Sequence, residues 1–394
     1  MEVKQGYKYT EEFGFIPEDW EIDNLENNIV YFKGYPFNSK NYIKSGRRVI
    51  RVSDMTYNKI NDFSKIYVSE DEAKKLTKYS LVENDIIITT VGSKPPMNNS
   101  LVGRAILVTC KDNYGLLNQN AVCLRAKNNV IQLFLFYLFM SKKYFNFLKL
   151  IIRGNANQGN ITLANLFYYK LLLPPIYEQK RISQVLRDMD KLIENIGALL
   201  EKKRNLKIAA MQKLLTPQPH WEEKKLKDIV GVITTGKLDA NAMDKNGIYR
   251  FYTCAKEFYW INKYAFEGNA ILISGNGANV GYIHYYSGKF NAYQRTYVLQ
   301  QFYCNDKLLK FFLDKNLSLR IEEELNSSNT PFIKKTTLVD MVIFLPPIQE
   351  QQKIAQILSD MDEEIDALEK ELEKYRLLKT GAMQELLTGK TRLV

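Results

Sequence analysis

One stretch of the sequence governs the organisation of the chain because it occurs twice. The first copy, at residues 173–216, reads LPPIYEQKRISQVLRDMDKLIENIGALLEKKRNLKIAAMQKLLT. The second copy, at residues 345–388, reads LPPIQEQQKIAQILSDMDEEIDALEKELEKYRLLKTGAMQELLT, and 25 of the 44 aligned positions are identical without a gap. A repeat of this length at a constant offset of 172 residues indicates an internal duplication. The sequence therefore predicts two related halves.

Each copy is predicted to form one long helix. A proline lies close to the first turn, Glu and Gln follow it, and no further proline interrupts either copy, a pattern typical of a helix. Apolar residues then recur at alternating four- and three-residue intervals, which is the spacing of a coiled-coil seam. The predicted seam consists of Ile182, Leu186, Met189, Ile193, Ile196 and Leu200 in the first copy and of Ile354, Leu358, Met361, Ile365, Leu368 and Leu372 in the second.

Charge predicts that the two helices pair with each other. Residues 176–216 carry nine Lys or Arg and five Asp or Glu, whereas residues 348–388 carry five and ten. A basic and an acidic helix, each with an apolar seam, are expected to associate. Two equivalent helices of one chain pack most simply antiparallel around a pseudo-two-fold axis, so we expect a coiled-coil spacer. The alternative is a pair of ordinary core helices in one compact domain.

The rest of the sequence is predicted to form two globular segments. Both open on a proline shortly before a tryptophan, at 17–20 and 217–221, but they share little else beyond strand-like fragments at 85–89 and 270–274. At 394 residues and 45% hydrophobic content, the chain can bury two cores. The expected fold class is α+β, with the following division: a globe at 1–172, the first helix at 173–216, a second globe at 217–344, and the second helix with its C-terminal tail at 345–394.

The excess of positive charge indicates a polyanionic partner. Of the formal charge of +11, the helices account for +4 and −5, which leaves +12 on the globes and termini. Asn, Gln and Arg read base edges, and Lys and Ser contact phosphates, although all of them are also typical of solvated turns. The candidate DNA-binding residues lie in loop-like segments of the globes: Lys94, Asn98, Asn99, Arg153, Asn155, Asn157, Gln158, Lys237, Asn276, Asn279, Gln294, Arg295, Ser328 and Asn329.

The sequence lacks the usual patterns of catalytic and metal sites. Its four cysteines and two histidines show no zinc-ligand spacing, and its Pro-Pro pairs lack the polar and aromatic neighbours that hold a flipped base. We therefore expect no catalytic residue, no metal and no cofactor. The longest apolar run, Ile131–Met140, is too short to cross a bilayer, and no secretion signal opens the chain. A cytoplasmic protein with no membrane partner is the simplest interpretation.

Taken together, these motifs resemble a known family. Two divergent globes, each closing on LPPI-x-EQ and a long helix that ends in Met-Gln-x-Leu-Leu-Thr, are similar to the specificity subunit of Type I restriction-modification systems. The resemblance covers nearly the whole chain. It implies that each globe is a target recognition domain reading one half of a bipartite DNA sequence, while the helices set the gap between the halves. It also implies a non-catalytic chain, since methyltransferase and endonuclease activities belong to partner subunits.

The resemblance further implies that two methyltransferase subunits dock on this chain and that restriction subunits join them. The docking elements would be the long helices, notably the repeated triplets Asp188, Met189, Asp190 and Asp360, Met361, Asp362. An apolar seam can also pair between two chains, so a homodimer is an alternative state in isolation. The residues alone leave two other interpretations open. One is a coiled-coil protein-interaction adaptor with non-specific DNA affinity, and the other is an enzyme with an unfamiliar site.

Overall fold

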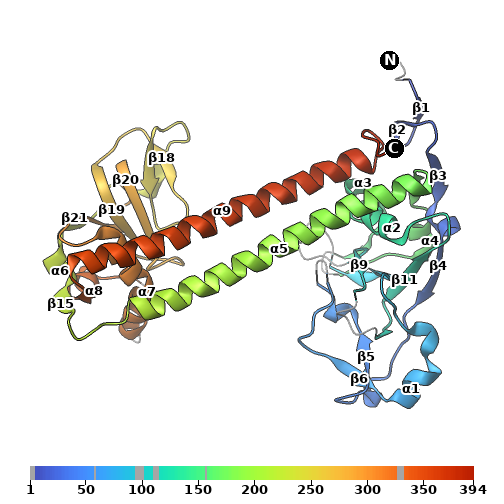
Figure 1. Cartoon of the computed structure of the whole chain (residues 1–394), viewed down its shortest axis with the longest axis horizontal. Coiled ribbons are helices and arrows are strands. Elements are labelled where there is room, and N and C mark those ends of the chain that lie inside the picture. The colour runs from blue at the N-terminus through green and yellow to red at the C-terminus, as the bar shows by residue number, and fades with distance from the viewer. Residues whose placement is uncertain (1–4, 57–58, 94–101, 110–114, 156–157, 326–331) are drawn as a thin grey trace. The chain divides into compact units, whose positions relative to one another are not determined.

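A computed structural model of the chain describes residues 5–56, 59–93, 102–109, 115–155, 158–325 and 332–394. The chain divides into two compact units, which we call unit 1 (Met1–Asn195 with Leu372–Val394) and unit 2 (Ile196–Glu371) (Figure 1). Two helices of 39 residues each, α5 (Ile176–Leu214) and α9 (Ile348–Leu386), contribute to both units. The prediction of two long helices is confirmed, because both begin directly after their Leu-Pro-Pro segment.

Unit 1 contains several small sheets and, among its described residues, four α-helices ahead of α5. Its elements are β1 (Tyr7–Thr10), β2 (Gly14–Pro17), β3 (Glu21–Asn24), β4 (Ile29–Lys33), β5 (Arg47–Ile50), β6 (Ile66–Val68), α1 (Glu70–Lys75), β7 (Ile86–Thr89), β8 (Val91–Gly92), β9 (Ala105–Leu107), β10 (Leu116–Leu117), β11 (Ala121–Ala126), α2 (Gln132–Phe139), α3 (Lys142–Ile151), β12 (Arg153–Asn155), β13 (Gln158–Asn160), α4 (Leu163–Phe167) and β14 (Lys170–Leu173). The central sheet has the antiparallel order β4-β11-β7-β9.

Unit 2 is built around one six-stranded sheet of the order β16-β21-β19-β20-β17-β18. Its elements are β15 (Glu222–Lys225), α6 (Leu226–Ile229), β16 (Val230–Thr235), β17 (Tyr249–Tyr252), β18 (Tyr259–Ile261), β19 (Phe266–Ser274), β20 (Ile283–Ala292), β21 (Thr296–Phe302), α7 (Asp306–Leu325), α8 (Lys335–Val339) and β22 (Val342–Leu345). All strand pairs in this sheet are antiparallel except β17 with β20. Mixed helices and sheets in both units confirm the α+β class.

The two globes share a core that the sequence comparison did not reveal. The strand order β4-β11-β7-β9 of unit 1 recurs in unit 2 as β16-β21-β19-β20, with the same antiparallel pairings. In both units the buried central strand alternates its side chains between two cores. Ile86 and Ile88 join the helix-covered core of unit 1, as Ile271 and Ile273 do in unit 2, and the residues between them face the opposite side. The two globes, which share little sequence, are therefore related in fold, as the internal duplication predicts.

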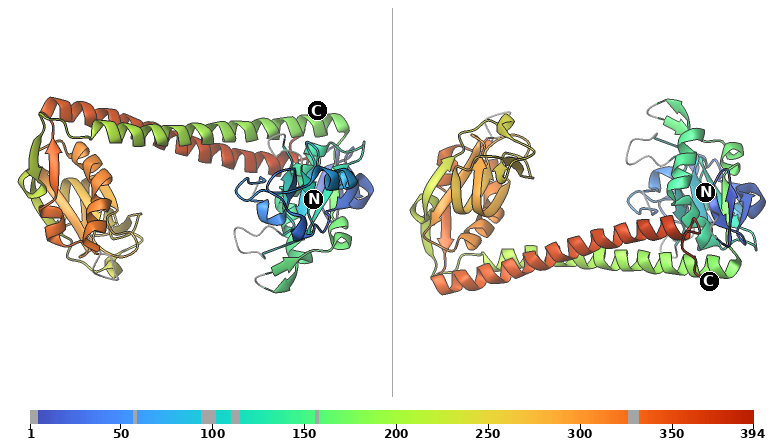
Figure 2. Two further views of the ribbon diagram at one scale, coloured as in Figure 1. Left: turned by 90° about the horizontal axis from the view of Figure 1, so that it is seen from below. Right: turned by 90° about the horizontal axis from the view of Figure 1, so that it is seen from above.

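The long helices pair antiparallel within each unit. In unit 1, Ile182 and Leu186 near the start of α5 are buried in the same core as Leu386 and Leu387 at the end of α9. In unit 2, the start of α9 packs in the same way beside the end of α5, where the two helices lie side by side in both views of Figure 2. All twelve predicted seam residues are buried or half-buried, so the apolar seam is confirmed.

Ion pairs between the helices follow the predicted charge pattern in unit 2. The basic residues of α5 contact the acidic residues of α9 in the pairs Lys203–Glu364 (2.5 Å), Arg204–Glu369 (2.5 Å) and Lys207–Asp362. In unit 1 the polarity is reversed, because Lys379 of α9 pairs with Asp190 of α5. Each exposed pair contributes only about 0.2–1 kcal/mol, so the buried seam supplies most of the association and the charges favour this partner.

Candidate functional site

The repeated Glu-Gln of the LPPI-x-EQ motif ties the start of α5 to the globe of unit 1. The side chain of Glu178 is fully buried, and it accepts a hydrogen bond of 3.0 Å from Nε1 of Trp20. Gln179 donates from Nε2 to the carbonyl of Pro174 (2.8 Å), and its Oε1 accepts from the backbone N–H of Ile131 (2.9 Å). The joint thus fixes the helix start to the segment before it and to the entry of α2.

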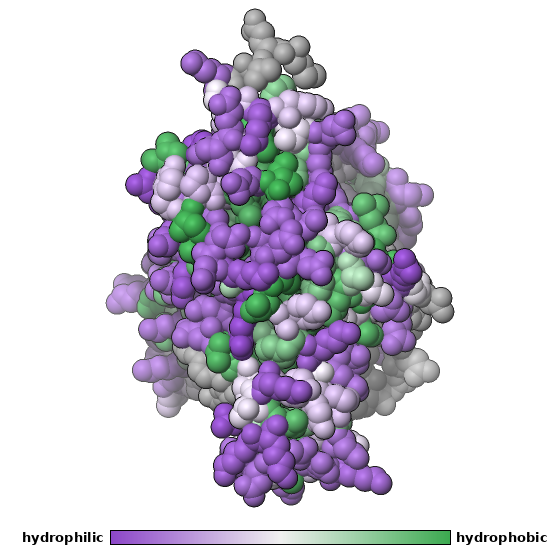
Figure 3. Space-filling view, turned by 90° about the vertical axis from the view of Figure 1, so that its right-hand side faces the viewer, coloured by the Kyte–Doolittle hydropathy of each residue, from purple (hydrophilic) through white to green (hydrophobic). Residues whose placement is uncertain are grey.

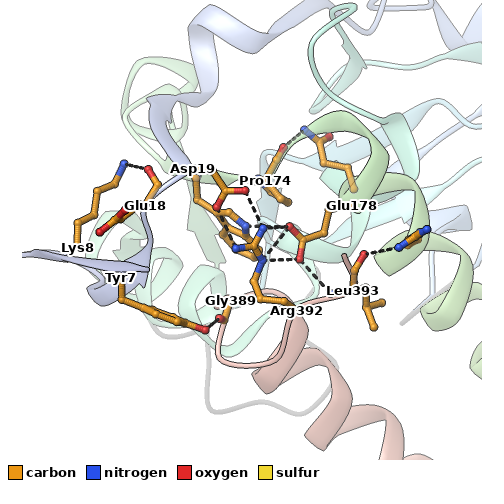
Figure 4. A network of polar contacts seen from close by, with 12 residues as sticks. Tyr7, Lys8, Glu18, Asp19, Pro174, Glu178, Gly389, Arg392 and Leu393 are labelled. Carbon is orange, nitrogen blue, oxygen red and sulfur yellow. Dashed lines mark hydrogen bonds and ion pairs between the residues drawn. The ribbon is translucent and has the colours of Figure 1, made fainter. Parts of the chain in front are cut away.

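The C-terminal tail completes this joint. Arg392 donates to both carboxylate oxygens of Glu178 and forms a two-bond contact with Asp19 at 2.9 and 2.8 Å (Figure 4). These hydrogen bonds, first of all those to Glu178, raise the pKa of Arg392 above its ordinary value. Tyr7 also donates to the carbonyl of Gly389 (2.9 Å). The buried carboxylate is therefore neutralised from the far end of the chain, as burial of a charge requires.

Unit 2 contains the same joint at the repeat offset. Trp221 Nε1 donates to Glu350 (3.2 Å), and Gln351 contacts the carbonyl of Pro346 (2.8 Å) and the backbone N–H of Asn305 (2.9 Å). His220, which stands 172 residues before Arg392, places Nε2 at 2.9 Å from Glu350. The sequence prediction assigned no role to these residues. Their recurrence in both copies, together with a tryptophan in each globe, is the signal that could have found them.

The predicted docking triplets are partly used inside the molecule. Met189 and Met361 pack against the cores of their units, and Asp190 and Asp362 form ion pairs with Lys379 and Lys207. Asp190 also accepts from the hydroxyl of Tyr137 (2.8 Å), whose pKa is raised first by burial and then by this carboxylate. By contrast, Asp188 and Asp360 are exposed and receive hydrogen bonds from Gln184 and Gln356, one turn earlier.

The predicted DNA-binding residues of unit 2 gather at one end of its sheet. They are Lys237, Asn276, Asn279, Gln294 and Arg295. The backbone N–H of Gly275, directly after β19, donates to the carbonyl of Arg295 (2.9 Å) just before β21. The N–H of Gln294 donates to the carbonyl of Leu238 (2.8 Å), which lies in the loop after β16. Three loops separated by up to 58 positions in the chain, counted from 237 to 295, therefore meet at this edge.

Cys254 supports the two asparagines of this cluster. Its thiol donates to Oδ1 of Asn276 (3.3 Å), and Asn279 donates from Nδ2 to its carbonyl (3.1 Å). Asn276 and Asn279 are half-buried, whereas Lys237, Gln294 and Arg295 are exposed. Backbone hydrogen bonds and the asparagine contacts with Cys254 thus hold these loops in place, and the side chains of Lys237, Gln294 and Arg295 extend from them into solvent.

The predicted residues of unit 1 lie on a hairpin beside β8. Arg153 and Gln158 belong to β12 and β13, which pair antiparallel, and β13 in turn pairs with β8 through Gly159 and Gly92. Of Asn155 the structure describes only the backbone, in β12. Gly154 in β12 has a φ of +112°, and a Cβ there would meet the carbonyl oxygen of Gln158 at 2.3 Å, so only glycine suits this position.

Six of the predicted DNA-binding residues cannot be placed. They lie outside the described residues and are Lys94, Asn98, Asn99, Asn157, Ser328 and Asn329. Two of the segments that contain them adjoin described residues that lie next to the predicted residues of unit 1 and unit 2. Gly92 precedes the first segment, and the residue after the last one, Phe332, forms a bridge with Asn276.

Two predicted arginines are available to an anionic partner. Arg153 and Arg295 are exposed and form no ion pair with any residue that the structure describes. Other arginines, such as Arg51, Arg125 and Arg392, are each held by a carboxylate. The face of unit 1 in Figure 3 is mainly hydrophilic, with apolar residues in small scattered groups. Exposed guanidinium groups that no described carboxylate neutralises suit a polyanion.

The described residues contain neither a cluster of metal ligands nor a membrane-spanning helix. Among them, no three His, Cys, Asp or Glu side chains are grouped as metal ligands would be. Within the same ranges, no helix combines the length and apolar composition that crossing a membrane requires. The architecture is a duplicated α+β fold, in which two globes of one design are each joined to a long helix by the same Trp-Glu-Gln contact.

Known proteins identify the family. Both halves of the chain, at residues 17–202 and 219–375, match the family described as Type I restriction modification DNA specificity domain. The chain belongs to this family of specificity subunits, which confirms the resemblance seen in the sequence.

Individual relatives match over different lengths. The putative type I restriction enzyme MjaX specificity subunit of Methanocaldococcus jannaschii is 26% identical over 424 residues, covering 99% of this chain and 97% of that protein. The EcoDI specificity subunit of Escherichia coli is 36% identical over 168 residues, which is 43% of this chain and only 37% of that protein. The crystal structure of the S subunit of a Type I system from M. genitalium has the same fold, with a TM-score of 0.69, 18% identity and coverage of 96% and 97%.

Proposed function

We propose that this chain reads a bipartite DNA target, one half-site per globe, as the specificity subunit of a Type I restriction-modification complex. The observation that carries the proposal is the paired placement of polar and basic side chains. Each of two globes with one core design presents an exposed arginine that forms no ion pair with any described residue and lies beside an exposed amide side chain, at Arg153 in unit 1 and Arg295 in unit 2. Such groups bind phosphates and base edges.

Two linked readers gain affinity from each other. Once one globe has bound its half-site, the second acts at a high effective concentration on any half-site at the right separation. The α5–α9 pair supports this role, because a buried seam and ion pairs stiffen the helices that connect the globes in sequence. The chain would then recognise both the base sequence of the two half-sites and the distance between them.

The same proposal assigns the chemistry to partners. Two methyltransferase subunits dock on the helices, restriction subunits join them, and the chain itself performs no catalysis and holds no cofactor. The duplication supports two methyltransferase subunits, since each half of the chain offers one exposed aspartate at the equivalent helix position. Because Asp190 and Asp362 are already in ion pairs, docking is assigned to Asp188 and Asp360.

A binding-site selection tests the proposal. The chain, co-purified with its methyltransferase subunits, is incubated with random duplexes, and the retained sequences are determined. We expect two short specific blocks at one fixed gap, with an affinity that falls steeply as salt increases. A single uninterrupted block, or binding without sequence preference and with a flat salt dependence, would overturn the proposal.

A further inference from the structure

The globes present one loop in the same way, and the sequence prediction recognised it in only one of them. We call the segments Asn118–Asn120 in unit 1 and Tyr293–Arg295 in unit 2 the entry loops, because each leads into the second strand of the shared sheet, β11 or β21. After the preceding central strand, the backbone N–H of Thr90 donates to the carbonyl of Asn120 at 2.8 Å. Gly275 donates to Arg295 at 2.9 Å in the matching position.

Further backbone contacts repeat between the two loops. Asn118 forms a parallel bridge with Tyr35, as Tyr293 does with Leu238. The N–H of Gln119 donates to the carbonyl of Tyr35 (3.0 Å), and the N–H of Gln294 donates to that of Leu238 (2.8 Å). The entry loops are therefore one structural element built twice, although their sequences, NQN and YQR, agree only in the central glutamine.

The backbone of each entry loop is fixed by a neighbouring glycine. A Cβ on Gly34 would lie 1.8 Å from the carbonyl oxygen of Asn118, and one on Gly236 would lie 1.8 Å from that of Ala292, just before the second loop. No other residue allows so close an approach of two backbone segments. Asn120 itself has a φ of +68°, a left-handed conformation that asparagine tolerates. Such loops lose little conformational freedom when they bind, because their backbone is already ordered.

The side chains of the entry loops remain available. Gln119, Asn120, Gln294 and Arg295 are exposed. Gln119, Asn120 and Arg295 donate no side-chain hydrogen bond to any residue that the structure describes, and Gln294 makes one long contact of 3.3 Å with Asp239. The half-buried Asn276 and Asn279 are instead engaged with Cys254. Exposed amides and an unpaired guanidinium on a fixed backbone are the groups that read base edges.

We propose that the entry loops are the base-reading elements of the two globes. Gln119 and Asn120 read adenine in one half-site through paired hydrogen bonds, and Arg295 reads guanine in the other, following the geometric match of these side chains to base edges in the major groove. This inference rests on the proposed function, because it assigns residues to the two readers assumed there. The hairpin residues Arg153 and Gln158 are left to hold the DNA backbone and the register.

Single substitutions in the two loops should have separate effects. The variants Gln119→Ala and Arg295→Ala are each co-purified with the methyltransferase subunits, and their targets are selected from random duplexes. Gln119→Ala should relax an A·T position in one half-site only, and Arg295→Ala should relax a G·C position in the other only, each with about a tenfold or greater loss of discrimination. Lys289→Ala, which removes an exposed cation beside Glu267 in unit 2, is the matched control and should leave both half-sites unchanged.

The outcomes separate this inference from the proposed function. If the wild-type chain selects no bipartite target, the proposed function fails. If the wild type selects one, and both loop variants retain the same bases in both half-sites, the entry loops are not the readers. Circular dichroism and co-purification with the methyltransferase subunits check folding. For a variant that folds poorly, Arg295→Lys gives a second test, because it keeps the charge but removes the fork geometry and should still relax the G·C position.

Discussion

The repeated glutamate is expected to contribute differently to the free energy of unfolding in the two copies of the repeat. Glu178 is fully buried between Trp20 and Arg392, whereas its counterpart Glu350 is about one-third exposed and faces Trp221 and His220. Removing one partner of a buried ion pair is costly because the other charge stays desolvated, while an exposed pair is well compensated by water.

The variants Glu178→Gln and Glu350→Gln are therefore expected to differ, although they stand at equivalent positions. Glu178→Gln should lower the stability of unit 1 by about 3 kcal/mol, whereas Glu350→Gln should cost unit 2 less than about 1 kcal/mol. Urea unfolding followed by tryptophan fluorescence measures both losses. Equal losses would show that burial does not set the importance of this contact.

Lys143 gives unit 1 a pH dependence at the residue scale. Its ammonium group is partly buried against the ring of Phe13, 3.8 Å from Glu12, and burial lowers its pKa from 10.5 to about 8, an effect that Glu12 opposes and Lys170 increases. Below pH 8 the lysine is charged in both the folded and the unfolded chain, so the folded state bears the full cost of burying the charge. Between pH 8 and 10.5 only the unfolded chain still binds the proton, and this cost disappears as the pH rises.

We therefore expect Lys143→Met to stabilise unit 1 at pH 7 and to lose this advantage as the pH approaches 10.5. Urea midpoints at pH 7, 8, 9 and 10 compare it with the wild type. Lys142→Met, which removes the exposed lysine one position earlier, is the matched control. An advantage of Lys143→Met that stays constant up to pH 10 would contradict the assignment.

At the scale of elements, the long helices were predictable and the sheets only in part. The seam from Ile182 to Leu200 is readable because helical contacts are local and periodic. The pairing of β7 with β11 joins residues such as Ile87 and Cys123, and no periodicity in either strand specifies the other. The shared sheet of the two globes therefore escaped the sequence comparison.

The sequence pointed to only one of the two loops that we assign to base reading. Gln294 and Arg295 were candidates from the sequence because Gln and Arg are residue types that read bases, and their role remains a prediction. Asn118–Asn120, to which we assign the same role, was not among the sequence candidates because three polar residues between apolar runs are typical of an ordinary turn. Only the backbone contacts, such as that of Thr90 with Asn120, show that it corresponds to the loop in unit 2.

The exposed aspartates of the long helices lead to a prediction about the docking of methyltransferase subunits. Asp188 and Asp360 are exposed, lie at equivalent positions of α5 and α9, and are assigned to docking. Asp188→Lys or Asp360→Lys should each remove one methyltransferase subunit, because a reversed charge at a contact repels the partner and costs several kcal/mol. The double variant should leave the chain without either subunit. Particle masses of the purified complexes report the count directly, and Glu194→Lys and Glu363→Lys are exposed controls on the same helices.

At the scale of the whole molecule, the duplication predicts that the base sequence of the half-sites and the gap between them are set by different parts of the chain. The entry loops lie in the globes, whereas the proposed function assigns the separation of the half-sites to α5 and α9, the long helices that follow each globe in the sequence. Adding one heptad to both helices, at facing positions of the seam, preserves the seam register and lengthens each helix by about 10 Å. Since a duplex rises about 3.4 Å per base pair, this corresponds to about three base pairs.

The lengthened chain should select the same two half-sites with a gap that is about three base pairs wider. Inserting one heptad in α5 alone is the control. The seam residues of α5 and α9 then no longer lie opposite their partners, so DNA binding should weaken without a new defined gap. The selection used for the wild type measures both variants. Recovery of the original gap by the doubly lengthened chain would show that the helices do not set the separation, and the globes would then have to position each other by direct contact or through the partner subunits.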